Sequence, residues 1–279
     1  RSEAAPLIGP ARPGRLHVMS FNIRYDRAGT QPGQADYWPE RAPLVEELVR
    51  RERPTVLGVQ EAEFTQLSAV EAALPPAYRM VGYGRDGGSG GEYSSLFFDT
   101  ERLELLEWDQ FWLSDTPELI GSTTWGNDIP RIVTWGRFLD RGAGTELVLV
   151  NTHFDHHSEN ARDRSAEALV DLVHSFHPHT PTVVTGDFNA EAGGSGAYTT
   201  LVGSGVLGDT WSTAEERLTP EWGTFPDYGE AVEGEERIDW VLASPGVRVA
   251  RSAINPSRFA GSHPSDHAPV QALVTLGRD

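Results

Sequence analysis

The chain has 279 residues, of which 38% are hydrophobic, so it holds enough apolar material for the buried core of one large domain. Asp and Glu outnumber Lys and Arg by 41 to 23, and the resulting formal charge of −18 disfavours tight, sequence-independent binding to duplex DNA. The absence of cysteine excludes disulfides, thiolate metal sites and a cysteine nucleophile. No apolar run approaches the roughly 20 residues that span a bilayer, so we expect a protein that does not cross a membrane.

The N-terminal stretch 1–14 is loop-like and is predicted to be a flexible segment, followed by a single catalytic domain over 15–279. The chain begins with Arg1 rather than methionine. We therefore expect a secreted or exported protein whose leader has been removed, with a cytoplasmic location as the alternative. We also expect a monomer without a stable protein partner.

Short apolar runs rich in β-branched residues recur along the chain, and each ends in polar residues. Such runs predict the buried strands of a sheet protein. They are Leu16–Asn22, Val56–Gln60, Leu96–Asp99, Ile132–Leu139, Leu147–Asn151, Thr182–Thr185, Ile238–Ala243 and Pro269–Thr275.

Two helices are predicted between these strands. Pro54 ends the first, and Pro39 and Pro43 leave its start undefined. Ser158 is the expected N-cap of the second. An order of strand, helix, strand, helix and then several strands favours a mixed sheet assembly over an alternating doubly wound fold. The apolar faces are Leu44, Val45, Leu48 and Val49 in the first helix and Leu169, Leu172, Val173 and Phe176 in the second.

Acids, amides and imidazoles collect where the predicted strands end, as catalytic residues of sheet proteins commonly do. Residues two apart in an extended segment point the same way, so we expect His153 with Asp155, and Asp187 with Asn189, each to face one side. Buried carboxylates that lie side by side are costly unless they share a cation. Mg²⁺ or Mn²⁺, with Ca²⁺ as a further option, is the natural partner of such oxygen ligands beside a phosphate.

Six motifs, in their order and spacing, closely resemble the endonuclease/exonuclease/phosphatase family, the DNase I-like superfamily. The resemblance runs from about Leu16 to Leu276, nearly the whole chain. Residues 85–99 and 111–135 resemble a bacterial branch nearer to the deadenylase-like members than to DNase I. The motifs are Ser20-Phe21-Asn22-Ile23-Arg24, Val59-Gln60-Glu61, Asn151-Thr152-His153, Gly186-Asp187-Phe188-Asn189, Arg237-Ile238-Asp239 and Ser265-Asp266-His267.

The resemblance implies an α/β (α+β) fold, a four-layer sandwich of two mixed β-sheets packed face to face with helices on the outside. It also implies the roles of the site residues. To these we add His156, which directly follows Asp155, as a substrate contact. The implied metal ligands are Asn22, Glu61, Asp187 and Asp266; the catalytic residues are His153, Asp187, Asn189, Asp239 and His267; and the substrate contacts are Arg131, His153 and Asn189.

The implied activity is divalent-metal-dependent hydrolysis of a phosphate ester. Because a phosphate anion repels hydroxide, such a site must neutralise the phosphate and supply a nucleophile in line with the leaving oxygen. Whether Asp187 or His267 takes the proton of the water is left open. The negative charge of the chain favours a small molecule or a lipid head group as substrate, with cleavage of DNA or RNA as the alternative.

Two rival interpretations remain at this stage. Thr152-His153-Phe154-Asp155-His156 echoes half of the zinc signature of metallo-β-lactamase-type enzymes, although Asn151 stands where the first ligand would be. The second interpretation comes from another class of protein: the chain would be a non-catalytic phosphate-binding module on the same fold. Loops 84–91 and 213–236 are rich in Gly, Pro and acidic residues, and 84–91 is either a flexible lid or an exposed turn.

Overall fold

The computed structural model describes residues 5–277, which form two mixed β-sheets. The first sheet has seven strands in the order β10-β12-β13-β1-β2-β4-β3, and the second has six in the order β5-β6-β7-β8-β11-β9. The pairs β1–β2 and β7–β8 are parallel, whereas β1–β13 and β6–β7 are antiparallel. The strands are β1 (Leu16–Asn22), β2 (Val56–Gln60), β3 (Tyr78–Val81), β4 (Leu96–Asp99), β5 (Leu103–Trp112), β6 (Ile132–Asp140), β7 (Thr145–His153), β8 (Thr182–Asp187), β9 (Gly208–Asp209), β10 (Glu216–Arg217), β11 (Asp239–Ala243), β12 (Arg248–Ile254) and β13 (Val270–Thr275).

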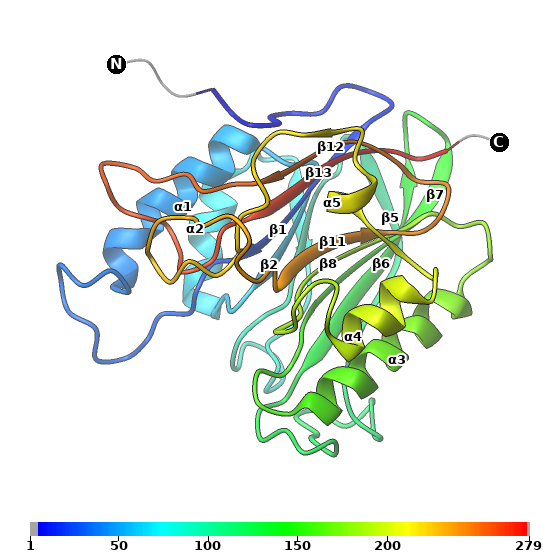
Figure 1. Ribbon diagram of the computed structural model, residues 1–279, viewed down its shortest axis with the longest axis horizontal. Coiled ribbons are helices and arrows are strands. Elements are labelled where there is room, and N and C mark those ends of the chain that lie inside the picture. The colour runs from blue at the N-terminus through cyan, green and yellow to red at the C-terminus, as the bar shows by residue number, and fades with distance from the viewer. Residues whose placement is uncertain (1–4, 278–279) are drawn as a thin grey trace.

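Helices cover the outer faces of both sheets (Figure 1). Helices α1 and α2 share a buried apolar cluster with β1, β2 and β4, and α3 shares another with β7 and β8. A third cluster joins the inner faces of the two sheets. The predicted four-layer sandwich is therefore confirmed. The helices are α1 (Trp38–Glu52), the 3-10 helix η1 (Phe64–Gln66), α2 (Leu67–Ala73), α3 (Glu159–Ser175), α4 (Gly196–Tyr198), the π-helix η2 (Thr199–Gly203) and α5 (Thr210–Thr213).

Strand β1 shows why the central strands were predictable. Leu16 and Val18 lie between the two sheets, while Met19 and Phe21 face the helices α1 and α2. A strand that is buried on both faces must be apolar at successive positions, and such a run is visible in the sequence. Each strand predicted from an apolar run is present, with ends that differ by a few residues at most.

Both long helices were also predicted, and the structure defines their ends. Helix α1 starts at Trp38 and carries Pro39 in its first turn. Proline is tolerated there because a backbone N–H in the first turn has no intrahelical acceptor. It ends at Glu52, and the C-cap residue Arg53, in a left-handed conformation with φ 41°, donates its N–H to the Val49 carbonyl at 2.7 Å. The Ser158 side chain caps α3 by accepting from the Ala161 N–H at 3.0 Å.

Besides the two-residue strands β9 and β10, three strands, β3, β5 and β12, were not predicted. β3 and β5 are edge strands, and only the two-residue strand β10 lies between β12 and the edge of its sheet. Polar and charged residues interrupt all three, and many of their side chains reach solvent. Edge strands are commonly protected by charged residues, so the apolar pattern that identifies a central strand is lost there.

The described part of the predicted flexible N-terminal segment is held against the domain. The backbone N–H groups of Leu7, Ile8 and Gly9 donate to the Glu52 carboxylate at 2.7, 3.1 and 3.1 Å. Residues 1–4 lie outside the described residues, whereas residues 7–9 are anchored rather than free. None of the helices within residues 5–277 is long and apolar enough to cross a membrane.

His17 is fully buried next to this anchor. Its Nδ1 lies 2.8 Å from the Gly9 carbonyl, and its Nε2 lies 2.9 Å from Nε2 of Gln271. A neutral ring satisfies both contacts, because Nδ1 donates to the carbonyl and Nε2 accepts from the amide. Burial lowers the pKa of His17 from 6.5 to about 4, although the Glu52 carboxylate opposes this effect.

We expect the free energy of unfolding to decrease as the pH falls from 6.5 to about 4, because the unfolded His17 takes up a proton in this range and the folded one does not. The contribution is fully present above pH 6.5 and is lost as the pH falls through about 4. Urea unfolding across this range, for the natural protein and for His17→Gln, measures it. The variant should lose less stability on acidification; equal losses in both proteins would contradict the prediction.

Candidate active site

The register of the strands brings the predicted site residues together at one end of the two sheets. In the six-stranded sheet, Asp187 of β8 is paired with His153 of β7 on one side and with Asp239 of β11 on the other. In the seven-stranded sheet, Asn22 ends β1 beside the last residue of β2, and Glu61 follows directly. Residues far apart in the chain thus become neighbours because their strands end at the same edge.

The side-chain amide of Asn22 links the two sheets. Its Nδ2 donates to the Glu61 carboxylate and, at 2.9 Å, to Oδ2 of Asp187. The amide nitrogen has two protons, so one side chain serves two carboxylates from different sheets. Asn22 and Asp187 are almost completely buried, and Glu61 is 9% exposed. Asn22 therefore holds two acids next to each other at the base of the site.

His267 is oriented by Asp239. Its Nδ1 lies 2.8 Å from Oδ2 of Asp239, which leaves Nε2 facing the acids, 3.6 Å from Oδ2 of Asp187. Burial alone would lower the pKa of His267, but the carboxylates of Asp239 and Asp187 raise it well above its ordinary value. His267 accordingly carries its proton at neutral pH.

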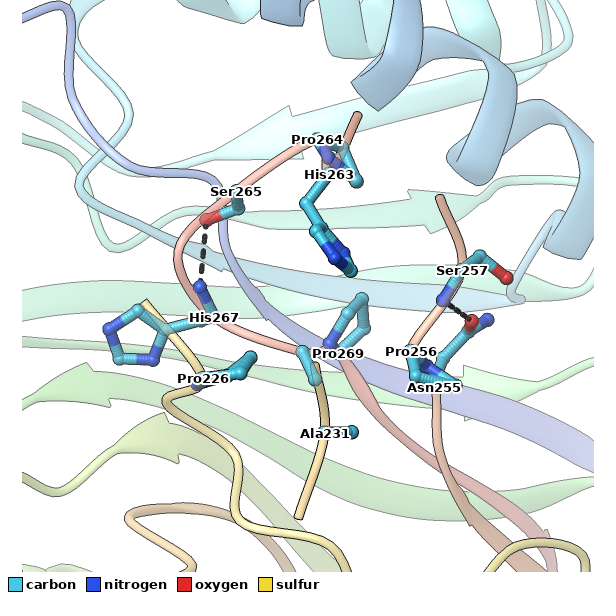
Figure 2. Close-up of a pocket in the computed structure, with 11 residues that line it drawn as sticks. Pro226, Ala231, Asn255, Pro256, Ser257, His263, Pro264, Ser265, His267 and Pro269 are labelled. Atoms are coloured by element: carbon cyan, nitrogen blue, oxygen red, sulfur yellow. Dashed lines mark hydrogen bonds between the residues drawn. The ribbon is translucent and has the colours of Figure 1, made fainter. Parts of the chain in front are cut away.

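The turn that precedes β13 fixes the backbone of His267. The Ser265 Oγ donates to the Asn22 carbonyl at 2.6 Å and lies 3.3 Å from the His267 N–H (Figure 2). On the other side of this turn, a hollow of only about 10 Å³ is lined by prolines, among them Pro226 and Pro269. Figure 2 shows the imidazole pointing away from that hollow.

Asp187 is the most highly connected acid of the site. Its Oδ1 accepts from the Asn189 N–H at 3.1 Å, and its Oδ2 lies 3.3 Å from Nε2 of His153. Burial alone would raise the pKa of Asp187, but His153 and His267, together with the hydrogen bond from Asn22, lower it well below its ordinary value. Asp187 is therefore a carboxylate at neutral pH.

Three residues around the site have left-handed backbone conformations. They are Arg24 with φ 59°, Glu61 with φ 61° and Asn189 with φ 46°. Residues other than glycine rarely adopt this region, because the conformation costs on the order of 1–3 kcal/mol per residue. It persists only where the surrounding structure holds the backbone in place. Each of the three follows the end of a strand by one or two residues. The sharp turn returns each side chain to the site.

These side chains line a cavity of about 710 Å³. Asn22 and Asp239 lie beneath it, in contact with its lining residues. The structure therefore brings all of the predicted site residues into one place, while their individual roles stay predictions. The predicted residues in the lining are Glu61, Arg131, His153, His156, Asp187, Asn189, Asp266 and His267.

The expectation that Asp155 faces the same side as His153 is wrong. The Asp155 carboxylate instead lies 3.2 Å from Nε of Arg131 and accepts from the N–H groups of His157 and Ser158 at 3.0 and 2.8 Å. Strand β7 ends at His153, so the alternation of an extended chain does not continue to Asp155. The zinc arrangement of the metallo-β-lactamase type is therefore not formed by these residues.

Several lining residues were missed by the sequence analysis. Arg24 is the last residue of the first of the six motifs, two residues after Asn22. This position was the only feature of the sequence that could have identified Arg24 as a site residue. Arg85 of the loop 84–91 forms an ion pair with Glu92, which directly follows this loop, and the position of the loop at the cavity fits both a lid and a turn. The other lining residues outside the predicted set are Tyr25, Glu63, Asp86, Gly91, Ile129 and Phe225.

Two groups of side chains in the described part of the chain could hold a metal ion. They are Glu61 with His153 and Asp187, and Asp187 with Asp239 and His267; in each group the possible ligand atoms lie within 4.8 Å of one another. Asp239 and His267 already bond to each other, so the group with Glu61 is the better site. Its buried carboxylate oxygens fit a hard divalent cation such as Mg²⁺ or Mn²⁺.

A family model decides the assignment. The model described as "Endonuclease/Exonuclease/phosphatase family" matches residues 19–267. The chain belongs to this family. The resemblance indicated by the six motifs is thereby confirmed, and the family's name fits a cavity in which acids and imidazoles converge.

Solved structures of the endonuclease/exonuclease/phosphatase family are similar over almost the whole chain. A Bacteroides thetaiotaomicron family member is 31% identical with a TM-score of 0.88, covering 96% of this chain and 100% of its own. The mannosyl-6-phosphatase Bt3783 of the same organism is 31% identical with a TM-score of 0.86, covering 93% and 99%. The human Nocturnin catalytic domain shares the fold at 18% identity, with a TM-score of 0.70 and coverage of 95% and 96%. No curated protein shows a significant match.

Below the cavity, buried polar side chains join the sheets. Nδ2 of Asn151 donates to the carbonyls of Val59 and Ser95 at 2.8 and 3.0 Å, and its Oδ1 accepts from Gln60 at 2.8 Å. Gly58 permits this approach, because a Cβ there would lie 2.1 Å from Oγ1 of Thr185 and 2.8 Å from the Asn151 side chain. The two sheets can therefore come this close only with glycine at position 58.

We expect Gly58→Ala to lower the free energy of unfolding by about 1–3 kcal/mol, because the added methyl group overpacks the space between the sheets. Gly142→Ala is the matched control, since position 142 is exposed and its Cβ would meet nothing closer than 3.4 Å. Urea unfolding of both variants measures the difference. Equal midpoints for the two variants would show that the sheets are not in close contact at this point.

Proposed function

We propose that the protein hydrolyses a phosphate ester with the help of Mg²⁺ or Mn²⁺. The observation that carries this proposal is that Oδ2 of Asp187 and Nε2 of His267 lie 3.6 Å apart at the base of one cavity, where the surrounding charges lower the pKa of Asp187 and raise that of His267. A deprotonated group can accept a proton from water, and a protonated group can donate to a phosphoryl oxygen. Both are needed at a phosphorus centre.

Glu61 and Asp187 would hold the cation, with Asn22 and Asp266 beside them. When bound, the cation supplies positive charge for the phosphate and lowers the pKa of a water molecule. The oxygen of the water forms a bond to phosphorus while the ester P–O bond breaks, and the leaving oxygen takes up a proton. Asp187 accepts the proton of the water, because it is an ionised carboxylate that lines the cavity next to the proposed metal ligand Glu61.

His267 donates to a nonbridging phosphoryl oxygen, and Asp239 keeps its Nε2 in position for this. Asn189 fixes His153, because its Nδ2 lies 3.2 Å from Nε2 of His153 and 2.9 Å from the Phe154 carbonyl. Arg131 adds positive charge to the lining of the cavity, where its Nη2 lies 3.0 Å from Nδ1 of His156. These groups stabilise charge on the phosphate as the bond to the leaving oxygen breaks.

The surroundings of the cavity favour a small phosphate ester over a long nucleic acid. Phe225 lines both the cavity and a neighbouring hollow of about 340 Å³. Glu230, Glu235 and Glu236 also line that hollow, so it disfavours a second phosphate group and suits a neutral, hydroxyl-bearing leaving group. A sugar phosphate fits this description, and the mannosyl-6-phosphatase that is 31% identical to the chain supports the same substrate class.

The test is a panel of p-nitrophenyl phosphate, hexose 6-phosphates, bis(p-nitrophenyl) phosphate, phospholipids, and single- and double-stranded DNA and RNA, each with Mg²⁺, Mn²⁺, Ca²⁺ or EDTA. We expect metal-dependent turnover of the small monoesters. Asp187→Asn and His267→Gln should each lower kcat by ~10²–10⁴-fold, because each removes a proton-transfer or hydrogen-bonding group.

Asp171→Asn is the matched control, since Asp171 is an exposed acid on α3. It should leave kcat unchanged. Faster cleavage of nucleic acid than of any small ester would identify a nuclease instead. Phosphate binding without any turnover would identify a non-catalytic binding module, and full turnover in EDTA would refute the role of the metal.

A further inference from the structure

Arg24 is a cation of the cavity for which the proposed mechanism has no role. It follows the end of β1 by two residues, and its backbone N–H donates to Oδ1 of Asn22 at 2.9 Å. Its side chain lines the cavity and is 23% exposed. The left-handed backbone at this position directs the side chain into the site at a conformational cost.

Asp36 holds the guanidinium group from behind. Its two carboxylate oxygens accept from Nε and Nη2 of Arg24, both at 3.1 Å, in the fork geometry that fixes an arginine in orientation. The hydroxyl of Tyr228 donates to Oδ1 of the same carboxylate at 2.8 Å. Burial alone would raise the pKa of Asp36, but Arg24 and Tyr228 lower it, so this partner stays charged.

The front of the guanidinium faces two acids at ion-pair distance but forms no hydrogen bond with either. Nη1 of Arg24 lies 3.7 Å from Oε1 of Glu61, and Nε lies 3.6 Å from Oδ2 of Asp266. Both distances exceed those of a hydrogen bond. Within residues 5–277, the hydrogen bonds of the Arg24 guanidinium use Nε and Nη2 only, so Nη1 retains its donor capacity.

The other arginines of the cavity differ from Arg24 in this respect. Arg131 contacts Asp155 through Nε and His156 through Nη2. Arg85 is paired with Glu92 in the rim loop. Arg24 is thus the arginine placed directly beside Glu61 and Asp266, at the position where a phosphoryl oxygen near these acids would otherwise meet negative charge.

We propose that Arg24 is a substrate-binding residue whose Nη1 donates to a nonbridging phosphoryl oxygen, and that Asp36 and Tyr228 are its positioning residues. This inference rests on the proposed function. A fixed guanidinium adds a positive charge to that of His267, so the site is matched to the two negative charges of a phosphate monoester rather than to the single charge of a diester.

The test compares Arg24→Gln with Arg27→Gln. Arg27 also contacts Asp36, at 3.1 Å, but its side chain is 53% exposed and it does not line the cavity. Three measurements are made: the Kd of inorganic phosphate in calorimetry, the Kd of Mn²⁺ in calorimetry without substrate, and the kinetics (kcat and KM) of p-nitrophenyl phosphate and its bis ester.

For Arg24→Gln we expect the Kd of inorganic phosphate to rise by ~10–100-fold, as for the loss of a charged hydrogen bond. The Kd of Mn²⁺ should stay the same or fall, because a positive charge next to Glu61 has been removed. The monoester should lose more of its kcat/KM than the diester does. Arg24→Lys should recover part of the phosphate affinity, and Arg27→Gln should change each quantity by less than about twofold.

Tyr228→Phe leaves every charge in place and removes only the hydroxyl that bonds to Asp36. It should raise the Kd of inorganic phosphate by a few fold without changing the Kd of Mn²⁺, and it replaces Arg24→Gln as the test if that variant does not fold. The proposal is overturned if phosphate binding is unchanged in Arg24→Gln, or if Mn²⁺ binding weakens as much as phosphate binding, since Arg24 would then only support Glu61. Phosphate and Mn²⁺ binding are measurable even if no ester is turned over, so the two proposals fail separately.

Discussion

Repulsion among buried carboxylates is the constraint on which the arrangement of this site depends. Glu61, Asp187, Asp239 and Asp266 come from separate strand ends, and all are 9% exposed or less. The surroundings offset their charges one by one: Asn22 donates to the first two, and His267 lies between Asp187 and Asp239. The acids would be costly to bury without a cation, and in the proposed mechanism the same arrangement lets Asp187 accept a proton and His267 donate a hydrogen bond to the phosphate.

The contact between the two sheets determines how closely these groups approach. Asn22 reaches from β1 to Asp187 on β8, and Asn151 reaches from β7 to backbone carbonyls of the other sheet. Gly58 allows the close contact below the cavity. The left-handed residues that follow the strand ends complete the site at a conformational cost, which rigid sheets can sustain. The layers therefore provide both the stability of the domain and the geometry of its chemistry.

Much of the fold and the membership of the site could be predicted from the sequence, for physical reasons. Central strands are buried on both faces and read as apolar runs, and site residues at their ends share one edge of a sheet, as Asp187 and Asp239 do. Edge strands such as β5 lack that pattern. The position of Asp155 was mispredicted because β7 ends before it. The places of Arg24 and Phe225 depend on loop conformation, which periodicity does not encode.

Binding of Mn²⁺ to the metal-free protein, followed by calorimetry, tests most directly whether these acids surround a cation. We expect Mn²⁺ to bind to the natural protein. Its affinity should fall by about tenfold or more in Glu61→Gln and in Asp187→Asn and should be unchanged in Asp171→Asn. The same affinity in all four proteins, or no binding to the natural one, would contradict the account.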